Sequence, residues 1–372
     1  MSESAKRFVT SQLDKIGVIV NGPNPWDPQV HNDRLWGRLL RDGTLGLGES
    51  YMEGWWDAAA LDQFLFRLIS GNIQNAFPKD LAVMWSVARG RLLNLQRLHV
   101  TEVGEKHYDI GNDLYAAMLD ARMIYSCGYW KNATDLDAAQ EAKLDLICRK
   151  VGLAPGMCIL DIGSGWGGFL QFAAERYGVS GVGVTVSKEQ AALANARTAG
   201  LPVETRLLDY QALDGQFDRI ISIGMFEHVG YKNYRAYFEK AASLLKPDGL
   251  MLLHSIGGHT STTHGDPWSE KYIFPNGMLP SIAQIGKAVE GLFVMEDWHN
   301  FGADYDRTLM AWRDRFDAAW PSLDSEKYDT RFQRMWRYYL SSFAAMFRAR
   351  SISLWQVVLS PHGVPGGYQS VR

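Results

Sequence analysis

Apolar residues follow two different patterns along this chain of 372 residues. From residue 144 onward, short apolar runs typical of buried strands alternate with stretches in which apolar residues recur at helical spacing. Leu144, Ile147, Cys148 and Val151 have that helical spacing, and Pro155-Gly156 ends the helix before an apolar strand over 157–162. We predict further strands over 181–186, 203–208, 217–223, 250–256, 293–298 and 352–359. Helices are predicted over 169–177 and 233–245, the second stopped by Pro247-Asp248-Gly249.

This alternation predicts an α/β fold with a doubly wound, mainly parallel sheet of seven strands, which binds its ligand at the carboxyl ends of the strands. The first hundred or so residues lack the alternation and are rich in Trp, Leu and Gly, with helical patterns over 62–68 and 81–95. We therefore expect a smaller, mostly helical domain over residues 1–100 and the α/β domain over 101–372.

Charge and cysteine usage narrow the class of protein. A net charge of −3 provides no global basic field, so we expect no nucleic-acid partner, and any attraction to a membrane must be local. The three cysteines show neither metal-ligand nor disulfide spacing, which predicts no metal site and a reducing cytoplasm. No apolar run approaches the roughly 20 residues of a membrane-spanning helix, and the N-terminus lacks a signal-peptide pattern. We expect a protein that is neither exported by a signal peptide nor integral to a membrane.

The glycine-rich stretch 160–169 fits two cofactor motifs. Gly163, Gly165 and Gly168 match the dinucleotide pattern G-x-G-x-x-G, whereas Gly163, Gly165 and Gly167 match the G-x-G-x-G of methyltransferases that use S-adenosylmethionine. Either pattern lets the backbone approach a ligand at a helix N-terminus. Asp161 decides between them, because its carboxylate would repel a pyrophosphate but favours the ammonium and sulfonium groups of S-adenosylmethionine. A plainer alternative is that Asp161 only caps the turn.

The ends of the next two strands support the same co-substrate. A dinucleotide site needs an acid at the end of the second strand to bind the ribose hydroxyls, and Val184-Thr185-Val186-Ser187 contains none. Gln190 could supply those hydrogen bonds, although Ser187 and Gln190 also form a capping-box pattern, and the two roles are compatible. Asp209 closes the third strand, where such folds contact the adenine, although acids at strand ends are often turn formers.

Other chemically active side chains lie at loop or strand ends and can converge over one ligand. Glu227 follows the fourth predicted strand, and a carboxylate at that edge faces the ligand cleft. Taken alone, Cys127, His254 and Tyr305 have simpler interpretations as inert packing, a satisfied core histidine and an ordinary aromatic.

Eight segments of the chain resemble the bacterial cyclopropane-fatty-acyl-phospholipid synthases. The resemblance covers nearly the whole sequence, including the part outside the α/β domain, so it is far more specific than the glycine loop. One departure is Ser164, where relatives often have Cys; a small residue is retained. The matching segments are 45–56, 107–114, 125–127, 160–168, 224–230, 271–277, 296–302 and 354–358.

The resemblance implies that residues 101–372 form a seven-stranded methyltransferase domain, Rossmann-like in fold, that transfers a methylene from S-adenosylmethionine to a cis double bond of a phospholipid acyl chain. It also implies a bound bicarbonate as the base, oriented by Glu227, hydrogen-bonded by His254 and Tyr305, and completed by backbone groups of Cys127 and Ile256. The expected co-substrate residues are Tyr125, Ser126, Asp161, Gly163, Gly165, Gly167, Thr185, Ser187, Gln190 and Asp209.

Relatives of this kind are peripheral membrane enzymes that form dimers. The resemblance therefore implies a homodimer that docks transiently on the cytoplasmic face of the phospholipid bilayer, with the N-terminal domain associated with lipid. A basic and apolar pattern over 79–97 is either a weak docking surface or an ordinary solvated helix face.

Three alternatives stay open. A lipid methyltransferase of the same fold would add a methyl group without closing the ring. A nicotinamide-dependent oxidoreductase would use the same glycines, but Asp161 and the missing ribose acid disfavour it. A lipid-binding module that lost catalysis would show damage among the five bicarbonate positions, and all five are filled.

Overall fold

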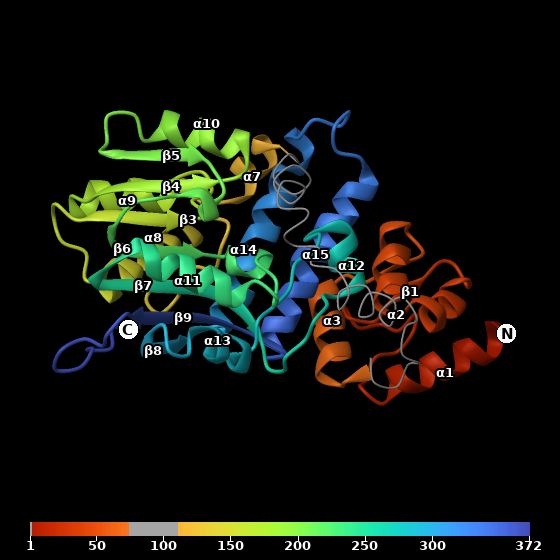
Figure 1. Cartoon of the computed structure of the whole chain (residues 1–372). Helices are drawn as coiled ribbons and strands as arrows, with labels where there is room; N and C mark the ends of the chain where they lie inside the picture. The colour runs from red at the N-terminus through yellow and green to blue at the C-terminus, as the bar shows by residue number, and fades with distance from the viewer. Residues whose placement is uncertain (1, 74–110) are drawn as a thin grey trace.

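The computed structural model describes residues 2–73 and 111–372. Its main sheet has seven strands in the order β5-β4-β3-β6-β7-β9-β8 (Figure 1). Neighbouring strands are parallel from β5 to β7, whereas β9 is antiparallel to both β7 and β8. The predicted doubly wound, mainly parallel α/β sheet is confirmed. The strands are β3 (Cys158–Ile162), β4 (Ser180–Thr185), β5 (Val203–Leu207), β6 (Phe217–Ile223), β7 (Leu245–Gly258), β8 (Val294–Asn300) and β9 (Ile352–Ser360).

The helix predicted over 233–245 is confirmed as α11 (Tyr234–Leu244), within one residue at each end. The strand predicted over 250–256 begins earlier, because Leu245 already pairs with Phe217 of β6 and opens strand β7. The register shifts between Phe217 and Arg219, so Pro247, Asp248 and Gly249 lie at an irregularity inside β7 rather than in a loop before it.

Helices cover both faces of the sheet because side chains alternate along each strand. Ile159 faces α8 (Leu136–Lys150) and α9 (Gly168–Tyr177), whereas Leu160 and Ile162 belong to a core shared with α11 and α13 (Ile282–Val289). The helix α10 (Lys188–Arg197) connects β4 to β5. This layering leaves the carboxyl ends of the parallel strands uncovered by α8, α9, α11 and α13.

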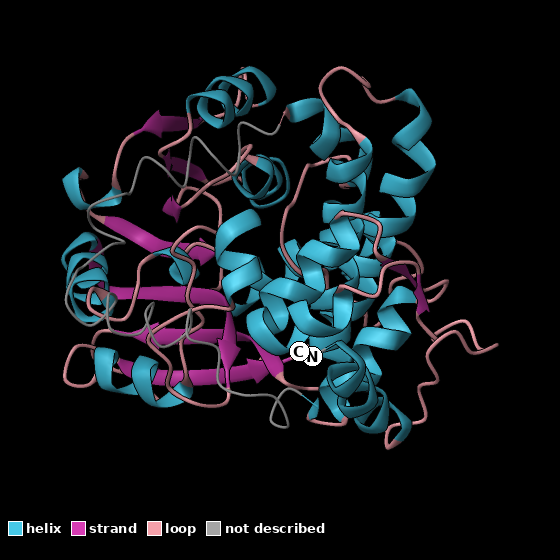
Figure 2. Ribbon diagram, turned by 90° about the vertical axis from the view of Figure 1, so that its right-hand side faces the viewer, coloured by secondary structure: helices cyan, strands magenta, loops and turns pink. Residues whose placement is uncertain are grey.

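The N-terminal residues form a helical unit beside the sheet. It comprises α1 (Ser2–Asp14), α2 (Leu35–Met52), α3 (Leu61–Ser70) and a small sheet of β1 (Gln29–Val30) and β2 (Trp56–Asp57). The helices α14 (Ala303–Ala319) and α15 (Thr330–Arg348) lie between this unit and the sheet (Figure 1). Figure 2 shows the large sheet on the left and the gathered helices on the right. The predicted helix over 62–68 is confirmed as α3.

Two other expectations remain predictions. The helix predicted over 81–95 and the domain boundary at residue 100 both lie outside the described residues. Within the described ranges, no helix is long and apolar enough to cross a bilayer.

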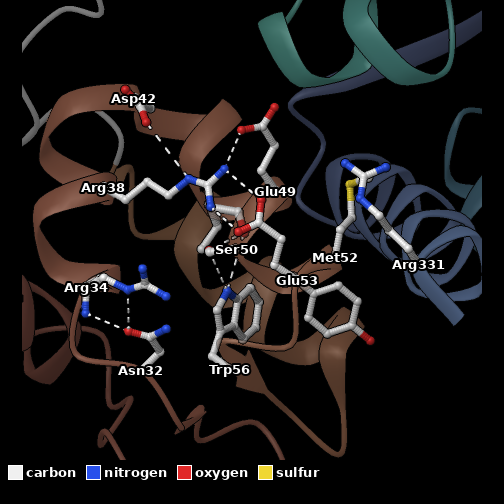
Figure 3. Close-up of polar contacts among 12 residues, drawn as sticks. Asn32, Arg34, Arg38, Asp42, Glu49, Ser50, Met52, Glu53, Trp56 and Arg331 are labelled. Atoms are coloured by element: carbon white, nitrogen blue, oxygen red, sulfur yellow. Dashed lines mark hydrogen bonds and ion pairs between the residues drawn. The ribbon is translucent and has the colours of Figure 1, made fainter.

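Ion pairs hold the helical unit against the rest of the chain. In α2, Arg38 pairs with Glu49 at 2.6 Å and with Glu53 at 2.7 Å (Figure 3). Glu49 also accepts hydrogen bonds from Lys271 and Tyr272, in and at the end of α12 (Pro267–Tyr272). Burial alone would raise the pKa of Glu49, but these three donors lower it to about 2. The carboxylate therefore stays ionised and ties α2 to the α/β part of the molecule.

Candidate active site

Two cavities meet at the carboxyl ends of the sheet. The smaller cavity, of about 190 Å³, is lined mainly by the loops that follow β3, β4, β5 and β6. The larger cavity, of about 1180 Å³, is lined by α1 to α3, β7, the segment 258–279, α14 and α15. Tyr125, Ser126, Gly224 and His228 line both cavities. A group bound in one cavity can therefore reach a group bound in the other.

The glycine loop shapes one wall of the smaller cavity. Gly163 and Gly165 line the cavity, and both have left-handed backbone angles, with φ of 84° and 54°. A Cβ atom at Gly163 would lie 2.7 Å from the Cβ of Met225, so no larger residue fits.

Gly167 is not among the described residues that line the smaller cavity. Its φ is 77°, and a Cβ atom at this position would lie 3.0 Å from the Cβ of Ala194, which explains the glycine instead. Gly167 therefore has a backbone role in the loop, and its contact with the co-substrate stays a prediction.

Asp161 lies at the end of β3 and lines the smaller cavity. Its side chain is buried, and its Oδ1 atom has no hydrogen-bond partner within the described residues. Burial raises the pKa of Asp161 to about 7, and the charge of Lys143 opposes that rise. An orphaned buried carboxylate oxygen on a cavity wall suits a ligand that carries hydrogen-bond donors and positive charge.

Polar side chains after β4 and β5 line the same cavity. Thr185 Oγ1 donates to Gln190 Oε1 at 2.8 Å, and the Ser187 N–H donates to Thr185 Oγ1 at 3.2 Å. Ser187 Oγ accepts from the Gln190 N–H at 3.3 Å, so only this half of the predicted capping box forms; the Gln190 side chain is held by Thr185 instead.

Ser187 caps α10 and is not among the described cavity-lining residues, whereas Thr185, Gln190 and Asp209 are. Asp209 also accepts a hydrogen bond from the Gln211 N–H and caps a short turn, so both of its predicted roles are compatible with its position.

Tyr125 and Ser126 form the shared wall between the cavities. The Tyr125 hydroxyl lies 2.7 Å from the Tyr339 hydroxyl, and burial raises its pKa well above the ordinary value, so the phenol stays neutral. Ser126 Oγ accepts a hydrogen bond from Lys143 Nζ at 2.9 Å. Lys143, in α8, is fully buried and lines the smaller cavity.

Sequence reasoning missed Lys143. The available signal was its place in α8, next to Leu144 and three residues after Gln140, on the side of the helix that its apolar residues bury. A lysine on the buried side of an amphipathic helix is unusual enough to indicate a specific role.

Glu227 lies on the wall of the larger cavity, in the short turn after β6. Its Oε1 accepts a hydrogen bond from the Ile256 N–H at 2.6 Å, and its Oε2 has no partner among the described residues. Burial raises the pKa of Glu227 to about 7, against the opposing effect of the Ile256 N–H. The Ile256 N–H is therefore used by Glu227; Ile256 lines the larger cavity, and the part of its backbone in an ion site stays a prediction.

His254 is held by a residue that the sequence did not single out. Gln356 of β9 lies directly opposite His254 of β7 in the sheet register, and its amide Nε2 is 3.3 Å from His254 Nδ1. An amide that donates to Nδ1 leaves the imidazole proton on Nε2. His254 lines the larger cavity, and its Nε2 has no hydrogen-bond partner within the described ranges. Burial lowers its pKa well below the ordinary value, so the ring is a neutral hydrogen-bond donor.

Tyr305 and Cys127 complete the predicted set but differ in access. Tyr305, in the first turn of α14, lines the larger cavity and packs its ring 4.5 Å from that of Phe347. Cys127 is buried and is not among the described lining residues. Its Sγ donates to the Gly128 carbonyl at 3.2 Å, and burial, with Asp304 nearby, raises the pKa of the thiol well above the ordinary value. Cys127 therefore presents no thiolate.

The rest of the larger cavity is mainly apolar. The N-terminal unit contributes a long stretch of this wall, including Leu39 of α2 and Phe64 and Leu65 of α3. Such a cavity can hold a long hydrocarbon and exclude water from its inner end. Within residues 2–73 and 111–372, no group of His, Cys, Asp and Glu side chains could hold a metal ion.

The family model and the relatives that match this chain all belong to one group of enzymes by their names. Residues 96–357 match the family model described as mycolic acid cyclopropane synthetase. The chain is 51% identical to the cyclopropane-fatty-acyl-phospholipid synthase of Escherichia coli, over 98% of this chain and 96% of that protein. It is 35% identical to a tuberculostearic acid methyltransferase of Mycobacterium tuberculosis, over 94% of this chain and 87% of that one.

A solved structure from the same family is also similar to this chain in its three-dimensional fold. The crystal structure of the mycolic acid cyclopropane synthase CmaA1, complexed with SAH and CTAB, superposes with a TM-score of 0.63 at 33% identity. The match covers 70% of this chain and 97% of that one.

Proposed function

The chain belongs to the mycolic acid cyclopropane synthetase family, and from that premise we propose that it is a cyclopropane-fatty-acyl-phospholipid synthase. It transfers a methylene group from S-adenosylmethionine to the cis double bond of an unsaturated phospholipid acyl chain. The observation that carries the proposal is the shared wall of Tyr125, Ser126, Gly224 and His228. This wall brings a small cavity that contains a buried carboxylate and a buried lysine against a large apolar one.

The smaller cavity takes the co-substrate. Asp161, with its orphaned Oδ1, accepts hydrogen bonds from the ammonium group, and the left-handed glycines 163 and 165 let the backbone approach the ligand closely. Gln190 and Asp209 line the same cavity and are the proposed hydrogen-bond partners of the ribose and the adenine. The residues present therefore fit S-adenosylmethionine, which supplies the electrophilic methyl group when bound.

The larger cavity takes the acyl chain and keeps water from the reacting carbons. The π electrons of the alkene form a bond to the sulfonium methyl carbon, the carbon–sulfur bond breaks, and a carbocation remains on the chain. The rings of Tyr125, Tyr339 and Phe274 face or line this cavity and can stabilise the cation. Removal of one proton from the added methyl group then lets its carbon–hydrogen electron pair close the ring.

Bicarbonate is the proposed acceptor of that proton. The support is that Glu227 Oε2 and His254 Nε2 are buried polar atoms without partners among the described residues, on one cavity wall where Tyr305 also lies. In this proposal His254 Nε2 and the Tyr305 hydroxyl donate hydrogen bonds to bicarbonate. Glu227, which is oriented by the hydrogen bond from the Ile256 N–H, accepts one from the bicarbonate hydroxyl. Cys127 contributes through its backbone and packing rather than its neutral thiol.

A second candidate is transfer of a methyl group without ring closure. Its support is the 35% identity to the tuberculostearic acid methyltransferase over nearly the whole chain. Both reactions pass through the same kind of carbocation and differ in which proton is removed. A base beside the added methyl group favours ring closure.

We also propose that the protein works as a homodimer that docks transiently on the inner face of the cytoplasmic membrane. An acyl chain in the larger cavity has to enter from a bilayer, and two docking surfaces would raise avidity. Segment 79–97, the proposed docking region, lies outside the described residues. Vesicle co-sedimentation and sedimentation velocity would test the two parts separately.

The activity is tested by incubating the purified protein with S-adenosylmethionine and phospholipid vesicles that carry cis-unsaturated chains. Mass spectrometry should show acyl chains that gain one methylene and no longer react as alkenes. Products that keep a reactive double bond would support the second candidate. Unmodified lipid would contradict both.

A further inference from the structure

We propose that Lys143, together with Ser126, forms the subsite that binds the carboxylate of an amino-acid ligand in the smaller cavity, whose wall also carries the ammonium site at Asp161. The inference rests on the proposed function, since it assigns the amino-acid end of S-adenosylmethionine. It adds a cation to a site for which the sequence suggested only an acid and neutral groups.

The position of Lys143 is the first support. Its side chain is fully buried in the wall of the smaller cavity, and Nζ donates to Ser126 Oγ at 2.9 Å. Ser126 lines the same cavity, so its hydroxyl can donate to a ligand while it accepts from the lysine. The two residues come from different elements and converge on one point of the wall.

The second support is that Lys143 has no ion-pair partner within 4.0 Å among the described residues. Four groups lie within its electrostatic reach: Asp120, Cys127, Asp161 and His254. Asp120 is occupied by the backbone N–H groups of Arg122 and Ile124, and Cys127 and His254 are neutral. A buried ammonium that makes one hydrogen bond to a hydroxyl, with Asp120 and Asp161 acting on it only at longer range, lacks a direct ion-pair partner that a ligand carboxylate could supply.

Charge complementarity identifies the ligand group. The amino-acid end of the co-substrate carries a carboxylate and an ammonium on the same carbon atom, and the cavity carries a lysine and an aspartate on its wall. Burial lowers the pKa of Lys143 to about 8, so the side chain is mostly charged at neutral pH. Its charge also counteracts the raised pKa of Asp161, which helps to keep that carboxylate ionised.

Bicarbonate is a second source of the same carboxylate chemistry. Lys143 is not among the described residues that line the larger cavity, where Glu227, His254 and Tyr305 lie, so the co-substrate is the favoured ligand. If bicarbonate were the ligand instead, a Lys143 variant would keep its affinity for the co-substrate product and would regain activity when bicarbonate is added.

The test measures binding of S-adenosylhomocysteine and of its decarboxylated analogue, which keeps the adenosine and the ammonium group, by calorimetry. The wild-type protein should bind S-adenosylhomocysteine at least about tenfold more tightly than the analogue. In Lys143→Met the affinity for S-adenosylhomocysteine should fall at least about tenfold while that for the analogue changes little, so the discrimination disappears. The matched control is Lys150→Met, because Lys150 is also buried in α8 but contacts Asp297 and His299 rather than the cavity.

Each result has a defined meaning. The inference would be overturned if Lys143→Met bound both ligands equally more weakly than wild type, or if it discriminated between them as wild type does. Rescue of its activity by bicarbonate, with unchanged affinity for S-adenosylhomocysteine, would also overturn it. If Lys143→Met does not fold, Ser126→Ala takes its place, with a partial loss of discrimination expected and full retention contradicting the inference. A wild-type protein that binds neither ligand would instead overturn the proposed function, since this binding does not depend on lipid chemistry.

Discussion

The two cavities of this molecule are built in opposite ways. The smaller cavity is lined by residues 123–233, most of them at the ends of consecutive strands of one sheet. The larger cavity joins α1 to α3 near the N-terminus with β7, α14 and α15, which lie at least about 170 residues later in the chain. A site made from neighbouring strand ends is encoded by local motifs, whereas a site made by packing distant helices is not.

The cavities also differ in how they treat charge. The smaller one places a buried lysine and a buried aspartate on its wall, which suits a charged ligand. In the larger one burial keeps His254 uncharged, and Glu227, whose pKa burial raises to about 7 as it does for Asp161, has no lysine or arginine among the described charges that act on it. Binding of a charged co-substrate and reaction of an apolar alkene therefore need separate environments that touch along one wall.

Substitution of Glu227 should show the largest difference between turnover, which depends on the larger cavity, and co-substrate binding, which depends on the smaller one. Glu227→Gln removes the group proposed to orient bicarbonate, so kcat should fall by about 100-fold or more. The affinity for S-adenosylhomocysteine, measured by calorimetry, should stay within about twofold, because Glu227 does not line the smaller cavity. Equal losses of turnover and affinity would mean that Glu227 is structural.

The same variant should change how stability depends on pH. Because the pKa of Glu227 is raised from 4.5 to about 7 in the folded state, wild-type stability falls as pH rises through that interval. Relative to wild type, Glu227→Gln should therefore gain up to roughly 3 kcal/mol between pH 4.5 and pH 8. Denaturant titrations of both proteins at several pH values measure this difference, and a gain that appears on acidification would contradict it.

Substitution of Asp161, the acid of the smaller cavity, should instead weaken co-substrate binding more than it slows turnover. Asp161→Asn should weaken binding of S-adenosylhomocysteine by about tenfold, since a charge-assisted hydrogen bond to the ammonium is lost. The kcat at saturating co-substrate should change less than the affinity. Glu189→Gln, at an exposed acid in α10, is the control and should bind as wild type. Unchanged affinity in Asp161→Asn would reduce Asp161 to a turn former.

A change in the wall that α2 contributes to the larger cavity should have the smallest effect. Leu39 of α2 lines this cavity, so Leu39→Trp should shorten it and lower turnover of long acyl chains by a few-fold relative to short ones. Leu40→Trp is the matched control, because Leu40 is also partly buried but does not line the cavity. Competition between phospholipids of different chain length, read by mass spectrometry, measures the ratio. The same ratio in both variants would contradict a role of α2 in chain selection.

The difference between the cavities also explains what the sequence could predict. The glycine loop, Asp161, Gln190 and Asp209 are tied to strand ends, and the seven strands follow from apolar runs, so the fold and the smaller cavity were largely predictable. Lys143 and Gln356 were missed because their importance comes from burial and from cross-strand register, which a single sequence does not display. The use of the Ile256 N–H by Glu227 is likewise a property of the assembled fold. The apolar wall of α2 and α3 has no motif at all, because a hydrocarbon site is defined by shape.

In the proposed reaction, a methyl group crosses the wall between the cavities and then loses one proton to close a ring. The decisive measurement uses S-adenosylmethionine with a fully deuterated methyl group, incubated with cis-unsaturated phospholipid vesicles. The acyl chains should retain two of the three deuterons in a saturated three-membered ring. Chains that retain all three deuterons and a double bond or a branched methyl group would contradict it.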